Sequence, residues 1–362
     1  MPGFIRGHHY FEHRKSGLLV VGRLETEADR KAARSLALGT GWPVYCDFAS
    51  SLKGTAGEME IFLPDHPKCR SLVRKYAPDV ILQLGSGLIS KHYYNEILKT
   101  GAKNIIQVSP RRGHRDPAFA VTIRITASVA EFCRHLGDGD MRFRTLNQKA
   151  AKTLVRSIQD LALDLHHITP DDVLSFPLIA DIINRHVPAG DALFAGNSTA
   201  VRAFDGAFGC SGQKVRIVTN RGASGIEGNF ATSIGFSAGS GRRVTAVIGD
   251  VSMLHDLNSL ALPGTVPGQV IGVVVNNQGG RIFDRLPVQE FPDIATPMMT
   301  TPHEFDFSHA ARMFSLPYTK AETPEAFEAA YVNALSQGGC RIIEVMLDPA
   351  TDLKIFLDRQ KL

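Results

Sequence analysis

Residues 244–283 read VTAVIGDVSMLHDLNSLALPGTVPGQVIGVVVNNQGGRIF, and the fold of the chain follows from this stretch. Residues 244–248 and 270–275 are short, uncharged, β-rich runs, which are typical of strands buried on both faces of a parallel sheet. Between them, residues 252–262 carry apolar side chains at helical spacing, and Pro263-Gly264 ends the helix. The stretch therefore predicts one strand–helix–strand unit with parallel strands.

Polar residues follow both strands, just beyond the carboxyl ends, where a parallel sheet binds its ligands. Asp250 follows the first strand, Asn276-Asn277 follow the second, and Gly279 is expected to leave a backbone carbonyl unhindered. A carboxylate, an amide oxygen and a main-chain oxygen supply half of an octahedral Mg²⁺ shell, which water and phosphate oxygens complete. The alternative is an ordinary unit whose turn residues are only solvated.

A Gly-Asp pair followed by an Asn-Asn pair resembles the signature of the thiamine diphosphate enzymes. The resemblance implies that Asp250, Asn277 and the carbonyl of Gly279 hold Mg²⁺, with Mn²⁺ as the alternative ion, and that this ion binds the diphosphate of the cofactor. Val251 stands where the signature usually has a glycine. The further residues that the resemblance places around the cofactor are Gly249, Val251, Ser252, Gly280, Ile282 and Phe283.

The composition is that of a globular protein, with 362 residues of which 44% are hydrophobic and 21% are charged, enough for roughly two domains. No run approaches the ~18 apolar residues of a membrane span, and residues 1–16 lack the apolar core of a secretory signal. The five cysteines form no CxxC pair, which favours reduced thiols in the cytoplasm. The net charge is only +4, and the densest basic cluster, at Arg111-Arg112, has no aromatic ladder, so nucleic acid is not an expected partner.

A glycine-rich segment at 85–90, GSGLIS, follows a predicted strand and opens a predicted helix, as a dinucleotide-binding loop does. However, Ser90 replaces the third glycine, and Ser109-Pro110 stands where such a site needs an acidic residue. The pattern therefore favours a Rossmann-like domain without a bound nucleotide.

Strands and helices alternate along the chain, so we expect two three-layer α/β/α domains of the Rossmann type with parallel sheets. Residues 1–16 are expected to be a frayed lead-in, 17–136 the first domain, 137–170 a linker with a connecting helix, and 171–362 the second domain. Thr169 is expected to cap the helix that follows the linker, with Pro170 in its first turn. The expected strands are 18–21, 43–46, 80–84, 105–108, 192–195, 216–219, 244–248, 270–275 and 342–347. The expected helices are 25–38, 91–99, 129–136, 141–165, 177–187, 252–262, 307–314 and 324–336.

Four segments in the right order resemble one family of thiamine enzymes. They are LGSGLISK at 84–91, Gly196-Asn197-Ser198 with Arg202 beyond it, NRGASGIEGN at 220–229 and NNQGGRIFDRLP at 276–287. Together they closely resemble the MenD family, the 2-succinyl-5-enolpyruvyl-6-hydroxy-3-cyclohexene-1-carboxylate (SEPHCHC) synthases of menaquinone and phylloquinone biosynthesis. The resemblance runs from about Gly17 to the C-terminus, across the middle and diphosphate-binding domains of that family.

This resemblance implies a transferase that decarboxylates 2-oxoglutarate on thiamine diphosphate and adds the resulting four-carbon carbanion to isochorismate. Both substrates are dicarboxylates, which arginine binds through two parallel hydrogen bonds. By resemblance, Arg202, Arg221 and Lys91 receive substrate carboxylates, while Asn197 and Ser198 hydrogen-bond the intermediate. For each of the three cations the alternative is a solvated surface charge.

Apolar and polar residues complete the site that the resemblance implies. Ile226 matches the bulky residue that, in this superfamily, holds the cofactor in a bent conformation. Phe283 and Leu286 would line the apolar side of the substrate pocket. Asp256 and Asn258 are candidates for supporting the diphosphate, with surface-facing polar residues as the alternative.

The family's N-terminal domain, which carries the glutamate that activates the cofactor, has no counterpart in residues 1–362. Glu227 is not expected to replace that glutamate, because it occupies an aspartate position of its own motif. We therefore expect a truncated gene, a split enzyme whose N-terminal part is a separate chain, or a non-catalytic relative. Since the family shares its sites between subunits, a homodimer or tetramer is expected. The functional alternatives are another thiamine-dependent 2-oxoacid decarboxylase or synthase subunit, and a non-catalytic cofactor-binding fragment.

Overall fold

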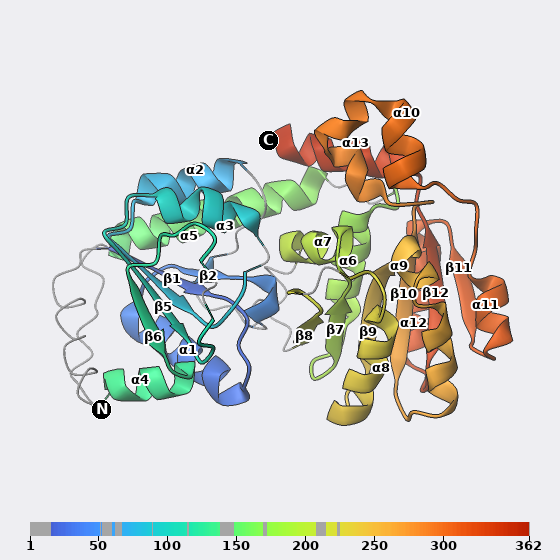
Figure 1. Cartoon of the computed structure of the whole chain (residues 1–362), viewed down its shortest axis with the longest axis horizontal. Coiled ribbons are helices and arrows are strands. Elements are labelled where there is room, and N and C mark those ends of the chain that lie inside the picture. The colour runs from blue at the N-terminus through green and yellow to red at the C-terminus, as the bar shows by residue number, and fades with distance from the viewer. Residues whose placement is uncertain are drawn as a thin grey trace. The chain divides into compact units, whose positions relative to one another are not determined.

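The computed structural model describes residues 16–50, 52, 60–61, 67–88, 90–113, 116–137, 148–168, 172–207, 215–222 and 225–361 (Figure 1). The chain divides into two compact units, Met1–His166 and His167–Leu362, and each is built around one six-stranded parallel sheet. This confirms the expected pair of α/β domains with parallel sheets. The division after His166 falls inside the segment 137–170 that was predicted to connect them.

The sheet of the first unit has the strand order β3-β2-β1-β4-β5-β6, and all neighbours are parallel. Its central strands, β1 and β4, are buried along their whole length because their side chains are largely apolar on both faces. The strands are β1 (Gly17–Val21), β2 (Val44–Cys46), β3 (Glu60–Ile61), β4 (Val80–Leu84), β5 (Asn104–Ser109) and β6 (Ile123–Thr126).

Helices cover the sheet of the first unit, with α1 packed against α4 and α2 packed against the segment η3. A capping box starts α1, because the Thr26 hydroxyl accepts from the amide of Asp29 and the Asp29 carboxylate accepts from the amide of Thr26. The helices that begin in this unit are α1 (Glu27–Thr40), α2 (Pro67–Tyr76), α3 (Lys91–Asn95), α4 (Val129–Gly137) and α5 (Gln148–Ile168), with the 3₁₀ segments η2 (Phe48–Ser50) and η3 (Ile97–Lys99).

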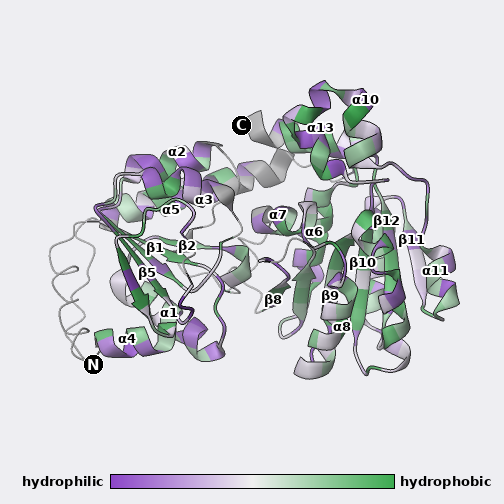
Figure 2. Ribbon diagram, in the orientation of Figure 1, coloured by the Kyte–Doolittle hydropathy of each residue, from purple (hydrophilic) through white to green (hydrophobic). Residues whose placement is uncertain are grey.

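The sheet of the second unit has the order β11-β12-β10-β9-β7-β8, again with all neighbours parallel. Its central strands form the hydrophobic centre of the unit (Figure 2). Gly249 pairs with Val275, so the residues that follow β9 and β10 emerge side by side. The strands are β7 (Ala192–Ala195), β8 (Arg216–Thr219), β9 (Val244–Gly249), β10 (Val270–Asn276), β11 (Tyr318–Ala321) and β12 (Arg341–Met346).

Helices of the second unit pack in two groups. One contains α6, α7 and α12, and the other contains α8, α9, α11 and the segment η4. The helices are α6 (Phe176–His186), α7 (Thr199–Ala207), α8 (Asn229–Ser240), α9 (Asp250–Leu254), α10 (Pro292–Ala295), α11 (Ser308–Met313), α12 (Pro324–Leu335) and α13 (Pro349–Lys361). The shorter turns are the 3₁₀ segments η4 (Leu257–Gly264), η5 (Arg281–Arg285) and η6 (Pro287–Glu290) and the π-helical turn η7 (Thr296–Thr300).

Two predicted helices are broken in the structure. Residues 252–262 are not one helix, because α9 already starts at Asp250 and ends at Leu254, and the following residues form η4. The break coincides with Asp256, whose carboxylate accepts the amide of Phe230 in the first turn of α8 at 2.6 Å. Residues 91–99 likewise divide into α3 and η3.

The predictions at the two ends of the first domain also need revision. Ser16 is not frayed: it is buried, and its amide and hydroxyl donate to Asp79 at 3.2 and 3.1 Å; residues 1–15 lie outside the described part. The connecting helix begins at Gln148 within that part, and residues 141–147 lie outside it. The predicted cap Thr169 also lies outside the described residues, and the next described helix, α6, starts at Phe176 with Ser175 as its cap.

The cysteines and the hydropathy of the helices complete the description of the fold. Of the described cysteines, Cys46, Cys69 and Cys340 are buried and Cys133 is half-buried, and Cys210 lies outside the described residues. Within the same ranges, none of the helices combines the length and the apolarity that a membrane crossing requires.

Candidate functional site

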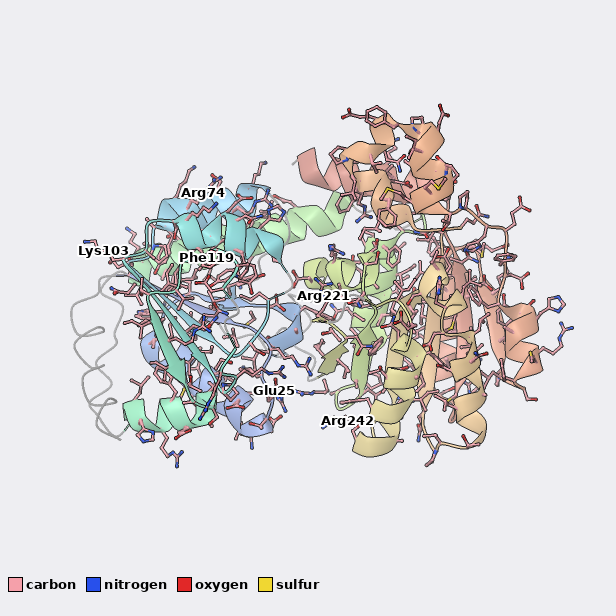
Figure 3. All side chains as sticks on the ribbon, viewed as in Figure 1. Glu25, Arg74, Lys103, Phe119, Arg221 and Arg242 are labelled. Carbon is pink, nitrogen blue, oxygen red and sulfur yellow. The ribbon has the colours of Figure 1, made fainter. Side chains whose placement is uncertain are left out.

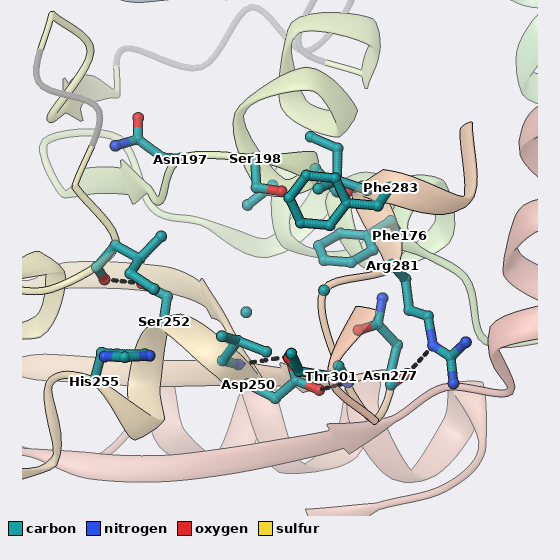
Figure 4. A pocket seen from close by; sticks show the side chains of 18 of the residues that line it. Phe176, Asn197, Ser198, Asp250, Ser252, His255, Asn277, Arg281, Phe283 and Thr301 are labelled. Atoms are coloured by element: carbon teal, nitrogen blue, oxygen red, sulfur yellow. Dashed lines mark hydrogen bonds between the residues drawn. The ribbon is translucent and has the colours of Figure 1, made fainter. Parts of the chain in front are cut away.

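A cavity of about 560 Å³ lies in the second unit, and its lining includes the residues that follow β7, β8, β9 and β10 (Figure 4). Along the chain, β8 is added on one side of β7 and β9 on the other, so the strand order reverses between β7 and β9. Open parallel sheets bind their ligands at such a point. The volume is in the range of small-molecule sites, roughly 300–1,000 Å³. Fourteen of the residues predicted to bind the cation, the cofactor or the substrates line this cavity. They are Asn197, Ser198, Arg202, Arg221, Ile226, Gly249, Asp250, Val251, Ser252, Asn277, Gly279, Gly280, Ile282 and Phe283.

Asp250 is the single acidic residue among the described residues that line the cavity, and it is only 2% exposed. Its Oδ2 accepts the amide of Gly279 at 2.9 Å, and its Oδ1 accepts the amide of Val251 at 2.7 Å. Burial raises the pKa of the Asp250 carboxyl above its ordinary value of 3.8, and these two amides offset part of the shift. Among the described basic side chains, His303 is the single one within 4.0 Å of the carboxylate, with its Nε2 3.4 Å from Oδ2. No described lysine or arginine lies that close. A bound cation would therefore favour the ionised form of this carboxyl.

The two neighbouring asparagines have different places in the structure. Asn276 is fully buried, and its Nδ2 donates to the carbonyl of Phe305 at 2.8 Å and to Glu344 Oε1 at 2.6 Å. Asn277 lines the cavity instead, on the same side as Asp250 (Figure 4). The second asparagine is thus the one available to a ligand, as the motif predicts.

The backbone conformation at position 279 and the close approach of a neighbouring carbonyl require a glycine there. Its φ is +134°, and a Cβ at this position would lie 2.5 Å from the carbonyl oxygen of Thr300. The expectation of an unhindered carbonyl is wrong in one respect, because the Gly279 oxygen accepts the amide of Arg281 at 2.9 Å in a tight turn. A carbonyl oxygen has two lone pairs, so one remains for a cation.

Three of the six described non-glycine residues with positive φ lie at or beside the cavity, and Ala77, Phe119 and Ser315 lie elsewhere. Ser198, Gln278 and Thr301 are not glycines and yet have φ values of +74°, +60° and +45°. Ser198 and Thr301 line the cavity, and Gln278 lies between two lining residues. Such conformations cost roughly 1–3 kcal/mol each and tend to occur at functional sites.

The charge of the cavity lining suits anionic ligands, because three arginines, Arg202, Arg221 and Arg281, line it together with a single described carboxylate. Arg202 is exposed and donates to the carbonyl of Ser198, four residues earlier. Arg221, labelled in Figure 3, is half-buried beyond the end of β8. Its guanidinium makes no hydrogen bond or ion pair that involves the described residues, so it is available for a carboxylate or phosphate.

The loop that carries Ile226 is attached to the segment that carries Asp250. The carbonyl of Ile226 accepts Asn229 Nδ2 at 2.8 Å and also the hydroxyl of Ser252. Asn229 Oδ1 in turn accepts Asn220 Nδ2 at 3.2 Å, so the two ends of the motif NRGASGIEGN are joined; residues 223–224 lie outside the described part. Ile226 itself is 37% exposed in the cavity wall, which leaves an apolar side chain for a ligand to cover.

Several residues considered from the sequence do not belong to this cavity. Asp256 is 7% exposed and caps α8, so its role in the structure is to stabilise that helix. Asn258 and Leu286 do not line the cavity, and Leu286 is 44% exposed at the turn between η5 and η6. Glu227 is exposed, and the amides of its own residue and of Ile226 lower its pKa. Lys91 begins α3 in the first unit, and its side chain lies outside the described part, so its contact with a carboxylate stays a prediction.

The structure adds residues that sequence reasoning missed. Phe176, at the start of α6, lines the cavity, and its amide donates to Asp352 of α13 at 2.9 Å. Arg281 also belongs to the lining, and its Nε donates to the carbonyl of Asn277 at 3.2 Å. The other additions to the cavity lining are Thr199, Ala200, His255, Met299 and Thr301. Arg281 lies inside a quoted motif and could have been noticed there, whereas Phe176 reaches the cavity only through the fold.

The residues fit a cation that carries a diphosphate. Within the described ranges, no three His, Cys, Asp or Glu side chains are grouped so that they could hold a metal ion. The predicted set is of another kind, with one carboxylate, one amide oxygen and one backbone carbonyl, which are ligands that Mg²⁺ accepts. The buried Asp250 carboxylate, which has no described arginine or lysine side chain within 4.0 Å, and the glycine turn at Gly279 are consistent with this set.

Two family models match the chain. The model described as "Middle domain of thiamine pyrophosphate" matches residues 6–167, and the model described as "Thiamine pyrophosphate enzyme, C-terminal TPP binding domain" matches residues 205–345. The fold, the cavity and these matches place the chain among the thiamine pyrophosphate enzymes.

Curated relatives show which family of thiamine pyrophosphate enzymes the chain resembles. The chain is 46% identical over 343 residues to the 2-succinyl-5-enolpyruvyl-6-hydroxy-3-cyclohexene-1-carboxylate synthase of Syntrophus aciditrophicus, with 94% of this chain and 59% of that protein aligned. It is 35% identical to the synthase of the same name from Rubrobacter xylanophilus, with 94% and 59% aligned, and 33% identical to that of Salinibacter ruber, with 94% and 57% aligned. The chain belongs to this SEPHCHC synthase family. It spans 57–59% of the length of these three relatives.

Proposed function

We propose that this chain binds thiamine diphosphate through Mg²⁺ and takes part in SEPHCHC synthesis, in which 2-oxoglutarate loses CO₂ and its other four carbons are joined to isochorismate. The observation that carries the proposal is that residues from four segments, 197–202, 221–226, 249–252 and 277–283, line one cavity at four adjacent strand ends. The names of the relatives support the choice of substrates.

In this proposal Asp250, Asn277 and the carbonyl of Gly279 hold the cation, with Mn²⁺ as a substitute for Mg²⁺. Bound thiamine diphosphate supplies the electron sink for the loss of CO₂. Ile226 supports the cofactor from the cavity wall, and the hydrogen bonds from Asn229 and Ser252 keep its loop in place. The same Ser252 follows Asp250 in α9, so one helical turn fixes both the cation site and the apolar support.

In this proposal two arginines, two polar residues and one phenylalanine form the substrate-binding side of the cavity. Arg221 and Arg202 bind carboxylates of the two dicarboxylic acids, since guanidinium groups pair with carboxylates through two hydrogen bonds. Asn197 and Ser198 form hydrogen bonds with the oxygen atoms on the reacting carbons. Asn197 Nδ2 donates to the carbonyl of Gly225 at 2.9 Å, which orients this side chain. Phe283 covers the apolar side and excludes water. Lys91 is proposed as a further carboxylate ligand.

Turnover is proposed to need more than these residues, because the relatives are longer and the family's activating glutamate belongs to its N-terminal domain. We expect the additional residues to act from a separate chain or from a longer product of the same gene. A homodimer or tetramer and a cytoplasmic location complete the proposal, the latter because the five cysteines form no CxxC pair.

Titration calorimetry of the purified chain with thiamine diphosphate, with and without Mg²⁺, tests the cofactor part. We expect binding that depends on Mg²⁺ and that Asp250→Ala abolishes. Asp293→Ala, which removes an exposed carboxylate from α10, is the matched control and should bind as the unaltered chain does. Binding that is equally strong in Asp250→Ala would refute the proposed cation site.

Release of CO₂ from 2-oxoglutarate and from pyruvate, with and without isochorismate, tests the reaction. The assay is run on the chain alone and on the chain co-expressed with the N-terminal region of the Syntrophus aciditrophicus relative. We expect consumption of 2-oxoglutarate that requires the added region and is coupled to isochorismate. A preference for pyruvate would instead identify another thiamine-dependent decarboxylase.

A further inference from the structure

His303 lies next to the proposed cation ligand although the motifs give it no role. Its side chain is 7% exposed, and its Nε2 is 3.4 Å from Oδ2 of Asp250. This nitrogen is buried and has no hydrogen-bond partner among the described residues. The gap is a few tenths of an ångström beyond the usual N–H···O range, roughly 2.7–3.2 Å. A buried ring nitrogen facing a buried carboxylate needs an explanation, since buried polar atoms are normally satisfied.

The other ring nitrogen determines which tautomer His303 adopts. The backbone amide of Phe305 donates to His303 Nδ1 at 3.2 Å, so Nδ1 acts as an acceptor and carries no proton. In the neutral ring the proton is therefore on Nε2, the atom that faces Asp250. A neutral His303 can therefore donate from Nε2 to Oδ2 of Asp250 once these two atoms approach more closely than 3.4 Å.

The segment that carries His303 is fixed from both sides. The ring of Phe305 stacks on the imidazole, with centroids 5.3 Å apart and planes 20° apart. The Phe305 carbonyl accepts Asn276 Nδ2 at 2.8 Å, and the same Nδ2 donates to the fully buried Glu344. Glu344 Oε2 also accepts the amide of Phe307 at 2.9 Å. A line of hydrogen bonds therefore runs from β12 through the first asparagine of the Asn-Asn pair to the segment that carries His303.

We propose that His303 is a positioning residue for Asp250: together with the amide of Gly279 it holds Oδ2 from the protein side, so that the carboxylate keeps the orientation that a cation requires. Outer partners of this kind orient the residues that bind metal ions directly. They preset the geometry and so reduce the ordering cost of binding. The inference rests on the proposed function, because Asp250 acts as a cation ligand only there.

Mg²⁺ affinity in the presence of saturating thiamine diphosphate, measured by calorimetry on the full chain, tests the proposal. His303→Leu removes the donor, and we expect Mg²⁺ affinity to fall about 10- to 100-fold, the usual effect of losing an outer partner of a metal ligand. His303→Gln keeps an N–H donor at a similar reach and should recover most of that loss. His309→Leu, which alters an exposed histidine on α11, is the matched control and should bind as the unaltered chain does.

Two further measurements separate positioning from a general loss of structure. The melting temperature of the cofactor-free chain should be similar for His303→Gln and His303→Leu while their Mg²⁺ affinities differ. Should His303→Leu fail to fold, His303→Asn, whose amide is shorter, replaces it under the same criterion. Nitrogen-15 spectra of the histidine ring should show the proton of His303 on Nε2, and a proton on Nδ1 would overturn the proposal.

The outcomes distinguish this inference from the proposed function. If the unaltered chain does not bind Mg²⁺ with thiamine diphosphate, the proposed function fails, and the role of His303 fails with it. If the unaltered chain binds and His303→Leu binds equally well, only the role of His303 is overturned. A weakening shared by His303→Leu, His303→Gln and His309→Leu would also overturn it.

Discussion

Replacing Gly279 by alanine changes one methyl group at the turn that is proposed to hold the cation. The backbone there has φ +134°, which side chains with L configuration rarely adopt, and the new Cβ would lie 2.5 Å from the Thr300 carbonyl oxygen. The Thr300 oxygen cannot move freely, because it accepts the amide of Gly280 at 2.7 Å. The turn at Gly279 must therefore rearrange, and the carbonyl proposed as a cation ligand moves with it.

The size of the effect follows from the strain. A non-glycine residue held in such a conformation costs roughly 1–3 kcal/mol. For a domain of the size of the second unit, each kcal/mol lowers the melting temperature by about 2–4 °C. We therefore expect Gly279→Ala to melt about 2–12 °C below the unaltered chain without ligands. If the displaced carbonyl costs Mg²⁺ binding the same 1–3 kcal/mol, the Mg²⁺ affinity should fall about 5- to 150-fold.

Gly235→Ala is the matched control, because Gly235 lies inside α8 with nothing near the added Cβ. That change should raise stability by about 0.5–1 kcal/mol, as alanine is the better helix former, and leave cofactor binding unchanged. Differential scanning calorimetry and Mg²⁺ titration measure both quantities. Gly279→Ala with the stability and Mg²⁺ affinity of the unaltered chain would refute the reasoning about this turn.

Three further predictions concern single carboxylates and one arginine. Asp256→Ala should lower the free energy of unfolding by about 1.5–3 kcal/mol in denaturant titrations, because the carboxylate caps α8, while Asn258→Ala at an exposed position should stay within about 0.5 kcal/mol. Since burial raises the pKa of Asp250, the cofactor-free protein binds more protons than the unfolded chain between the ordinary carboxyl pKa and the raised one. Its stability should therefore fall as pH rises through that window, and Asp250→Asn should flatten this part of the thermal-unfolding profile; an unchanged profile would contradict the shift. Arg221→Ala should weaken binding of 2-oxoglutarate about 10- to 100-fold through loss of a charged hydrogen-bond pair, and an equal loss in Arg242→Ala, an exposed arginine that does not line the cavity, would contradict the assignment.

Nine of the twelve described strands and most of the cavity could be predicted because they depend on local sequence, whereas the edge strands β3, β6 and β11 were not predicted. Strands that are buried on both faces read as short apolar runs, and the runs 80–84 and 192–195 have the predicted limits in the structure. The edge strand 216–219, in which half-buried and buried residues alternate, also has its predicted limits. The residues that follow such strands must share one edge of the sheet. For this reason the residues proposed around the cofactor could be chosen from motif positions alone.

Other parts of the site depend on contacts between distant segments, and the sequence carries no local signal for them. The predicted helix 252–262 fails because Asp256 caps α8, a contact that no helical periodicity reveals. His303 follows Asp250 by many residues and reaches it only because the segment after η7 returns to the end of β10. Phe176 enters the cavity wall in the same way, from the start of α6.

Crystals of the chain grown with Mn²⁺ and thiamine diphosphate would test the central claim most directly, because the anomalous scattering of Mn²⁺ locates the ion. We expect one peak within about 2.0–2.3 Å of a carboxylate oxygen of Asp250, the side-chain oxygen of Asn277 and the carbonyl oxygen of Gly279, with phosphate oxygens completing the shell. A peak bound elsewhere, or a diphosphate seated in the cavity without an ion at these three oxygens, would contradict the account.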